Sequence, residues 1–79
     1  MNDKFVQRKS LRKKLLLELY NHYFEDTGKP FIVKSEVVKD SEIKLAYEYL
    51  AGKKFISINH KGNYSILTIT PYGIDAIEN

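Results

Sequence analysis

The sequence AYEYLAGKKFISI, residues 46–58, changes from a helical pattern to a strand pattern. Around its start, the apolar residues fall at positions i, i+3, i+4 and i+7 of one helical face: Ile43, Ala46, Tyr47 and Leu50. This helix is expected to begin at a cap formed by Asp40 or Ser41 and to end at about Gly52. Beyond it, apolar and polar residues alternate from Phe55 to Asn59, which is typical of a half-buried strand.

Downstream of this stretch, the pattern predicts a β-hairpin followed by a short helix. Residues 60–63, HKGN, are expected to form the turn, because glycine and asparagine adopt positive φ readily. The return strand is expected over Tyr64–Ile69. Thr70 can then cap a helix that has Pro71 at its first position, where a missing N–H costs nothing.

Upstream, helix-forming residues predict a long first helix over about Lys4–Asp26, which Gly28 ends. Its core face is expected to carry Leu16, Leu19, Tyr20 and Tyr23. A second apolar stripe, formed by Leu17 and Phe24, widens the apolar arc of this helix. Two interpretations stay open for Leu17 and Phe24, namely a core that wraps far around the helix and a possible dimer interface.

Two short elements are expected between these helices. Phe31–Val33 is β-prone and long enough only for a short edge strand. Ser35 can cap one helical turn that runs through Lys39. No repeat, low-complexity tract or linker divides the chain, so residues 1–79 are expected to form one domain, with residues 1–10 as a basic N-terminal arm or helix extension.

Composition narrows the function classes. The chain has no cysteine, so the sequence predicts neither a disulfide nor a thiolate metal site. No apolar run approaches the roughly 20 residues that span a bilayer, and we expect a cytoplasmic protein that does not bind membranes. No phosphate-binding glycine loop, catalytic acid pair or nucleophile motif is present, so we expect no enzymatic activity, cofactor or metal.

The positive charge is concentrated at the amino end. Residues 1–14 carry a net charge of +5, whereas the rest of the chain carries −2. A basic segment of this kind is typical of proteins that bind phosphates or anionic lipid, although it can also be a solvated arm. The membrane interpretation is disfavoured because Leu15 and its neighbours are needed to cover the core.

Two segments resemble a known family. Residues 46–58 resemble the end of the recognition helix and the first wing strand of small bacterial and phage regulators of the MarR and PadR kind. Residues 69–78, ITPYGIDAIE, resemble the entry into the helix after the wing in the same proteins. The chain departs from them in the short segment Ser35–Asp40, and in Lys54, which stands where they usually have glycine before the strand.

The resemblance implies an α+β winged helix-turn-helix fold, with a three-helix core, a two- to three-stranded β-hairpin wing and a short C-terminal helix. It also implies a protein that binds double-stranded DNA, such as a small transcriptional regulator or a mobile-element factor, and that acts as a homodimer. Because winged helices also dock on proteins, an adaptor of a replication or transcription complex is the alternative.

In this fold the recognition helix, its flanks, the wing tip and the basic amino end would face DNA. The candidate DNA-contact residues are Arg8, Lys9, Arg12, Lys13, Lys34, Ser35, Lys39, Ser41, Lys44, Leu45, Glu48, Lys61 and Asn63. For Ser35 and Ser41, helix capping is an alternative role to phosphate binding. His60, beside the wing tip, is expected to be a DNA contact rather than a catalytic base, and His22 to be structural.

Overall fold

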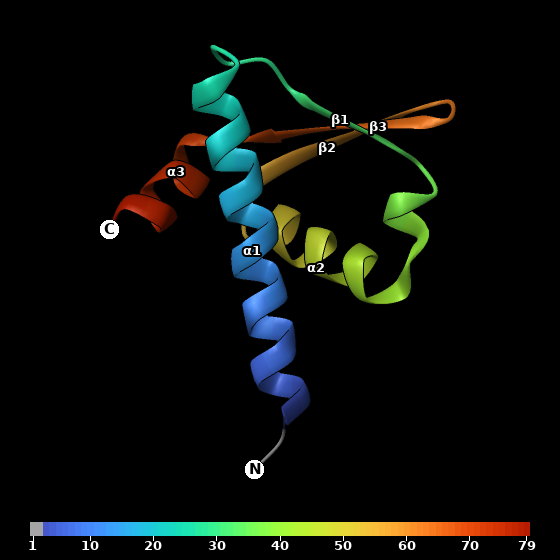
Figure 1. The fold of residues 1–79 in the computed structure, drawn as a ribbon, viewed down its shortest axis with the longest axis vertical. Helices are drawn as coiled ribbons and strands as arrows, with labels where there is room; N and C mark the ends of the chain where they lie inside the picture. Colours follow the sequence, from blue (N-terminus) through green and yellow to red (C-terminus); the bar gives the residue numbers. More distant parts are fainter. Residues whose placement is uncertain (1–2) are drawn as a thin grey trace.

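The computed structural model describes residues 3–79, which form three α-helices and one three-stranded antiparallel sheet (Figure 1). The elements are α1 (Asp3–Glu25), β1 (Phe31–Lys34), a 3₁₀ turn η1 (Val37–Lys39), α2 (Ser41–Gly52), β2 (Ile56–Lys61), β3 (Tyr64–Ile69) and α3 (Pro71–Glu78). The fold class is α+β, as the sequence predicts. Residues 3–10 are the first turns of α1, and residues 1–2 lie outside the described residues.

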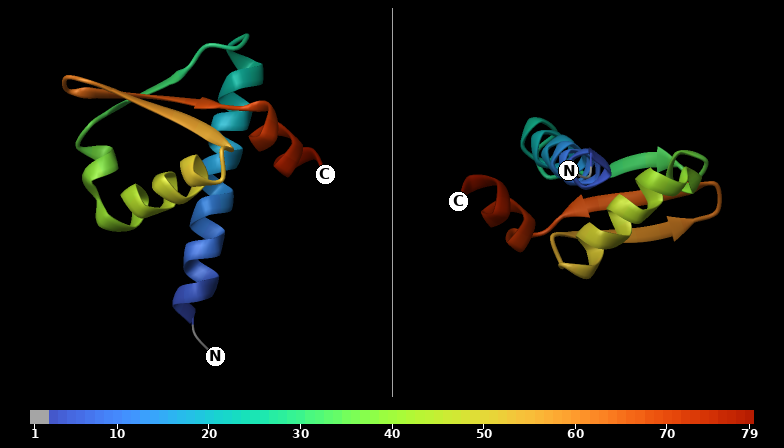
Figure 2. Two further views of the ribbon diagram at one scale, coloured as in Figure 1. Left: turned by 180° about the vertical axis from the view of Figure 1, so that it is seen from behind. Right: turned by 90° about the horizontal axis from the view of Figure 1, so that it is seen from below.

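The sheet has one buried and one open face. Its strand order is β1-β3-β2, so β3 is the central strand. Alternation along β3 places Ser65, Leu67 and Ile69 on the buried face, while Tyr64 points to the other side. In Figure 2, α2 lies against one face of the sheet, and no described helix covers the opposite face. The face without a helix is the open face of the sheet.

The core forms where α1 and α2 meet the buried face of the sheet. Its buried hydrophobic members are Leu15, Leu16, Leu19, Ala46, Tyr47, Leu50, Ile56, Leu67 and Ile69. Leu19 of α1 is 2 % exposed and Leu67 of β3 is fully buried, so these two elements meet at the centre of the core. Complete burial of one such side chain stabilises the fold by about 1.5–3 kcal/mol.

The connection from α2 to β2 depends on a strained residue. Lys54 has a φ of 66°, in the left-handed region that favours glycine. In this conformation its N–H donates to the carbonyl of Ala51, which closes the helix end. α2 therefore ends at Gly52, as the sequence predicts, and Lys54 adopts the left-handed conformation although it is not glycine.

α3 is fixed at its start and its end. The Thr70 hydroxyl accepts a hydrogen bond from the Gly73 N–H at 3.2 Å and donates to the carbonyl of Lys54. At the other end, the Tyr20 hydroxyl of α1 donates to the Glu78 carboxylate at 2.8 Å, and this hydrogen bond raises the pKa of Tyr20. The cap at Thr70 and the first position of Pro71 confirm the sequence prediction.

Two local expectations were wrong, and one of the two open interpretations of Leu17 and Phe24 is excluded. The turn through Lys39 is present as the 3₁₀ turn η1, but its cap residue is Glu36 and not Ser35, whose N–H and hydroxyl donate to the hairpin instead. The hairpin turn is tighter than residues 60–63, since β2 continues to Lys61. The core does not wrap around α1, because Leu17 and Phe24 are 45 % and 53 % exposed.

Replacing Gly73 by alanine should destabilise the fold by about 1–3 kcal/mol, because the new Cβ would collide with the carbonyl oxygen of Phe55 and crowd Ile69. Gly52→Ala is the matched control, because a Cβ at this residue would meet no neighbouring atom within 4 Å, and it should leave stability unchanged or raise it. Urea unfolding of both variants measures the difference. Equal stabilities would contradict the close packing of α3 on the α2–β2 connection.

Lys54→Gly should stabilise the fold by about 1 kcal/mol, because glycine adopts a positive φ without the cost that a Cβ brings. Thermal unfolding by circular dichroism checks this, with Lys53→Gly as the control at a neighbouring residue of φ −79°. A loss of stability on Lys54→Gly would show that this helix end is not strained.

Candidate nucleic-acid interface

The candidate DNA-contact residues separate into groups in the structure. One group, which we call the hairpin-end patch, lies where β1 ends beside the β2–β3 turn and consists of Lys34, Ser35, Lys39, Lys61, Asn63 and Tyr64. A second group lies between α1 and α2, around Arg8 and Arg12. In Figure 1 the N-terminal turns of α1 and the β2–β3 turn lie far apart along the longest axis of the molecule.

At the hairpin end, the register of the sheet creates a row in which one tyrosine ring lies between two lysines. Tyr64 of β3 is directly opposite Lys34 of β1 and also directly opposite Lys61 of β2. Side chains of directly opposed residues project from the same face of a sheet. Tyr64 is 51 % exposed. The row therefore presents an exposed phenol ring between two ammonium groups on the open face.

A shallow depression of about 360 Å³ adjoins this row. Its lining includes Lys34, Lys39, Asn63 and Tyr64, together with Glu36. Two ammonium groups and one amide can donate hydrogen bonds there, against a single carboxylate, so the depression suits an anion such as a phosphodiester. The sequence predicted Lys34, Lys39 and Asn63 separately, and the structure brings them to one place.

Ser35 holds this depression together. Its N–H donates to the carbonyl of Asn63 at 2.8 Å, and its hydroxyl donates to the carbonyl of Gly62 at 3.4 Å. These bonds fix the end of β1 to the β2–β3 turn. They therefore keep Lys34 close to Asn63. Ser35 lines the depression but uses its hydroxyl proton within the protein.

The start of α2 already has an anionic partner. The Asp40 carboxylate accepts hydrogen bonds from the N–H groups of Glu42 and Ile43, both at 3.2 Å. Asp40 is therefore the cap, and Ser41 is an exposed first residue of the helix. A phosphate at this helix end would have to displace the Asp40 carboxylate. Lys44 is exposed further along α2.

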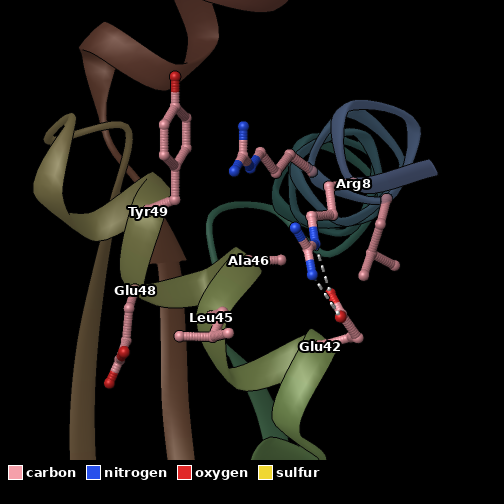
Figure 3. A pocket seen from close by; sticks show the side chains of 8 residues that line it. Arg8, Glu42, Leu45, Ala46, Glu48 and Tyr49 are labelled. Atoms are coloured by element: carbon pink, nitrogen blue, oxygen red, sulfur yellow. Dashed lines mark hydrogen bonds and ion pairs between the residues drawn. The ribbon is translucent and has the colours of Figure 1, made fainter. Parts of the chain in front are cut away.

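The two arginines of α1 contact α2 (Figure 3). Arg8 donates from two nitrogens to the Glu42 carboxylate, each at 3.3 Å. The guanidinium carbon of Arg12 lies 3.9 Å from the centre of the Tyr49 ring, a cation–π distance. Arg8 and Arg12 line a pocket of about 480 Å³ together with two further candidate residues, Leu45 and Glu48. In Figure 3 Glu48 points away from α1, and its side chain is exposed.

The two candidate lysines of α1 differ from the arginines. Lys9 and Lys13 are exposed and make no ion pair within residues 3–79. They lie at the edge of an apolar groove that also reaches α3. The basic amino end is thus not one uniform surface, because its arginines anchor α1 to α2 and these lysines stay in solvent.

Neither histidine lies in the hairpin-end patch. His60 is adjacent to Lys61 in β2 and so points to the opposite face, where its Nδ1 lies 2.9 Å from the hydroxyl of the fully buried Ser65. His22 lies 2.9 Å from the Asp26 carboxylate and 3.1 Å from the carbonyl of Pro30, which ties the end of α1 to the segment before β1. Residues 3–79 contain no acidic or histidine cluster suited to a metal.

Sequence reasoning missed Tyr64. A turn over residues 60–63 would end β2 too early to pair Lys61 with Tyr64, whereas the tighter turn at Gly62 and Asn63 aligns them. The φ of 59° at Gly62 fits a two-residue hairpin turn, which is a common connection between strands. The pair Gly62-Asn63 is the sequence signal for such a turn, and it would have revealed the row.

No helix among the described residues combines the length and apolarity that crossing a membrane requires. The chain matches no protein family model, no curated protein and no solved structure. The residues and their geometry are therefore the basis for a functional proposal.

The contact between Arg12 and Tyr49 should have a measurable coupling energy of about 0.5–1 kcal/mol. A double-mutant cycle with Arg12→Ala and Tyr49→Ala, read by urea unfolding, measures it. The pair Lys44 and Glu48 on α2 is the control, because these residues form no ion pair in the described part of the chain. A coupling of zero for Arg12 and Tyr49 would show that the arginine is available to other ligands.

Proposed function

We propose that the chain is a winged helix-turn-helix protein that binds double-stranded DNA, as a small transcriptional regulator or a mobile-element DNA-binding factor. The order of elements supports this, with α2 as the recognition helix and the β2–β3 hairpin as the wing. The resemblance of residues 46–58 and 69–78 to small regulators supports it as well.

The observation that carries the proposal is the row of Lys34, Tyr64 and Lys61 beside the depression that Lys39 lines. Ammonium groups of the wing would contact phosphates, and these contacts would set the position of the protein on the duplex. The exposed Tyr64 ring would pack against the sugars between two phosphates.

α2 supplies the residues for base recognition in this proposal. Ser41, Lys44, Leu45 and Glu48 are exposed on the side of α2 away from the core. Lysine can donate to guanine, glutamate can accept from cytosine, and leucine can contact the methyl group of thymine. Arg8 and Glu42 would fix the inner side of the helix while the outer side faces the groove.

The proposal includes a homodimer, because one helix and one wing read only a few base pairs. The side of α1 that carries Leu17 and Phe24 is the candidate interface. Within its own chain the Phe24 ring already contacts those of Tyr20 and Tyr23, in tilted and edge-to-face arrangements with ring-centre distances of 4.8 and 5.3 Å. These rings form a preorganised apolar surface that a second copy could cover.

DNA binding should be salt-dependent and should depend on the wing lysines. Fluorescence anisotropy of a labelled duplex of about 25 base pairs, over a salt series, measures both quantities. Lys34→Ala/Lys61→Ala should reduce the salt slope by about 2, at about 0.9 for each lost phosphate contact.

Lys29→Ala/Lys53→Ala is the matched control, since it removes two exposed lysines outside the patch. It should change the slope by less than half as much. Absent binding at low salt, or an equal loss in both double variants, would contradict the proposal.

A further inference from the structure

A groove of about 830 Å³ lies between the N-terminal half of α1, the end of α2 and α3. Apolar residues from all three helices and from the connection between α2 and β2 line it, including Leu16, Leu50, Phe55 and Ile77. On the α1 side, Phe5 and Val6 are 70 % and 55 % exposed. An exposed apolar surface of this kind marks a site of interaction.

The charge along the groove has one sign. Its lining contains four cationic residues, Arg8, Lys9, Arg12 and Lys13, and no carboxylate. Lys9 and Lys13 have no ion-pair partner within residues 3–79. An apolar groove with a cationic edge is complementary to a ligand that has one apolar face and acidic flanks.

The backbone around the groove decides the conformation of such a ligand. No strand edge contributes to its lining, and helices satisfy their own backbone groups internally. Phe55, the lining residue outside the helices, donates its N–H to Leu50 and accepts from the N–H of Thr70. A bound segment would gain no main-chain hydrogen bonds here and must satisfy its own, which a helix does.

We infer that this groove binds an acidic amphipathic helix of a partner protein. Apolar side chains at i, i+3, i+4 and i+7 of that helix would enter between Phe5 and Ile77, and its glutamates or aspartates would face Lys9 and Lys13. The inference is independent of DNA binding, because the hairpin-end patch and the groove share no residue.

The electrostatics of α1 supports an acidic partner. Arg8 and Arg12 are like charges spaced i, i+4 on this helix, as are Lys9 and Lys13, so each pair repels, and the first turn has only Asp3 as an acidic residue. Carboxylates placed beside these residues would remove the repulsion. The exposed Phe5 would be covered at the same time.

Other occupants fit the groove less well. A second copy joined by two-fold symmetry would bring the same lysines of both chains into one interface. A flat bilayer surface can reach Phe5 and Val6 at the edge, but it cannot follow the concave surface down to Leu50. A DNA backbone would pair with the lysines and leave the apolar lining exposed.

The test uses the full chain and a fluorescein-labelled helical peptide of about 18 residues, with leucines at i, i+3, i+4 and i+7 and glutamates elsewhere. Anisotropy should detect binding with a Kd below about 100 μM. A matched peptide with lysines in place of glutamates should bind at least about tenfold more weakly. Absent binding, or equal binding of both peptides, overturns the inference.

Variants locate the binding. Lys9→Glu/Lys13→Glu should weaken the acidic peptide about tenfold, and Phe5→Ser about fivefold. The controls are Lys29→Glu/Lys53→Glu and Tyr72→Ser, which change exposed residues outside the groove. The inference is overturned if the controls weaken binding equally. It is also overturned if Phe5→Ser abolishes self-association or binding to anionic vesicles while peptide binding is unchanged.

Discussion

The packing of the α1 leucines against the buried face of the sheet is the constraint on which the rest of the structure depends. Leu19 and Leu67 are among the most completely buried side chains of this core, to which α2 adds Ala46, Tyr47 and Leu50. Because one face of the sheet is used in this way, its other face stays open and carries Tyr64 between two lysines. Because the core takes only the C-terminal half of α1, the first turns extend beyond the body of the fold (Figure 1).

Local sequence signals predicted the elements well where local chemistry decides them. The helical face of α2, the strand β3 and the Thr70 cap are each set by residues close in sequence, and the structure confirms them. Ser35 behaved differently, because its hydrogen bonds go to a hairpin turn almost thirty residues away. The same holds for the candidate site, since residue types suggested Lys34 and Lys61, whereas only the register of the sheet reveals that Tyr64 lies between them.

The structure also divides the basic residues by role. Net charge alone suggests that the amino end is the strongest phosphate-binding segment. The guanidinium groups of Arg8 and Arg12, however, already contact side chains of α2. Exposed ion pairs and cation–π contacts contribute only about 1 kcal/mol each, so these arginines position α1 more than they stabilise the fold. Their contacts orient α2 for base recognition in the proposed function, and they also shape one side of the apolar groove.

Amide chemical-shift mapping of the isotope-labelled chain with an unlabelled duplex of about 25 base pairs tests the central claim most directly. The account predicts that the largest shifts cluster at Lys34, Lys39 and the β2–β3 turn, extend along the exposed side of α2, and leave the groove around Phe55 and Ile77 unchanged. Shifts confined to the first turns of α1, or no shifts at low salt, would contradict it.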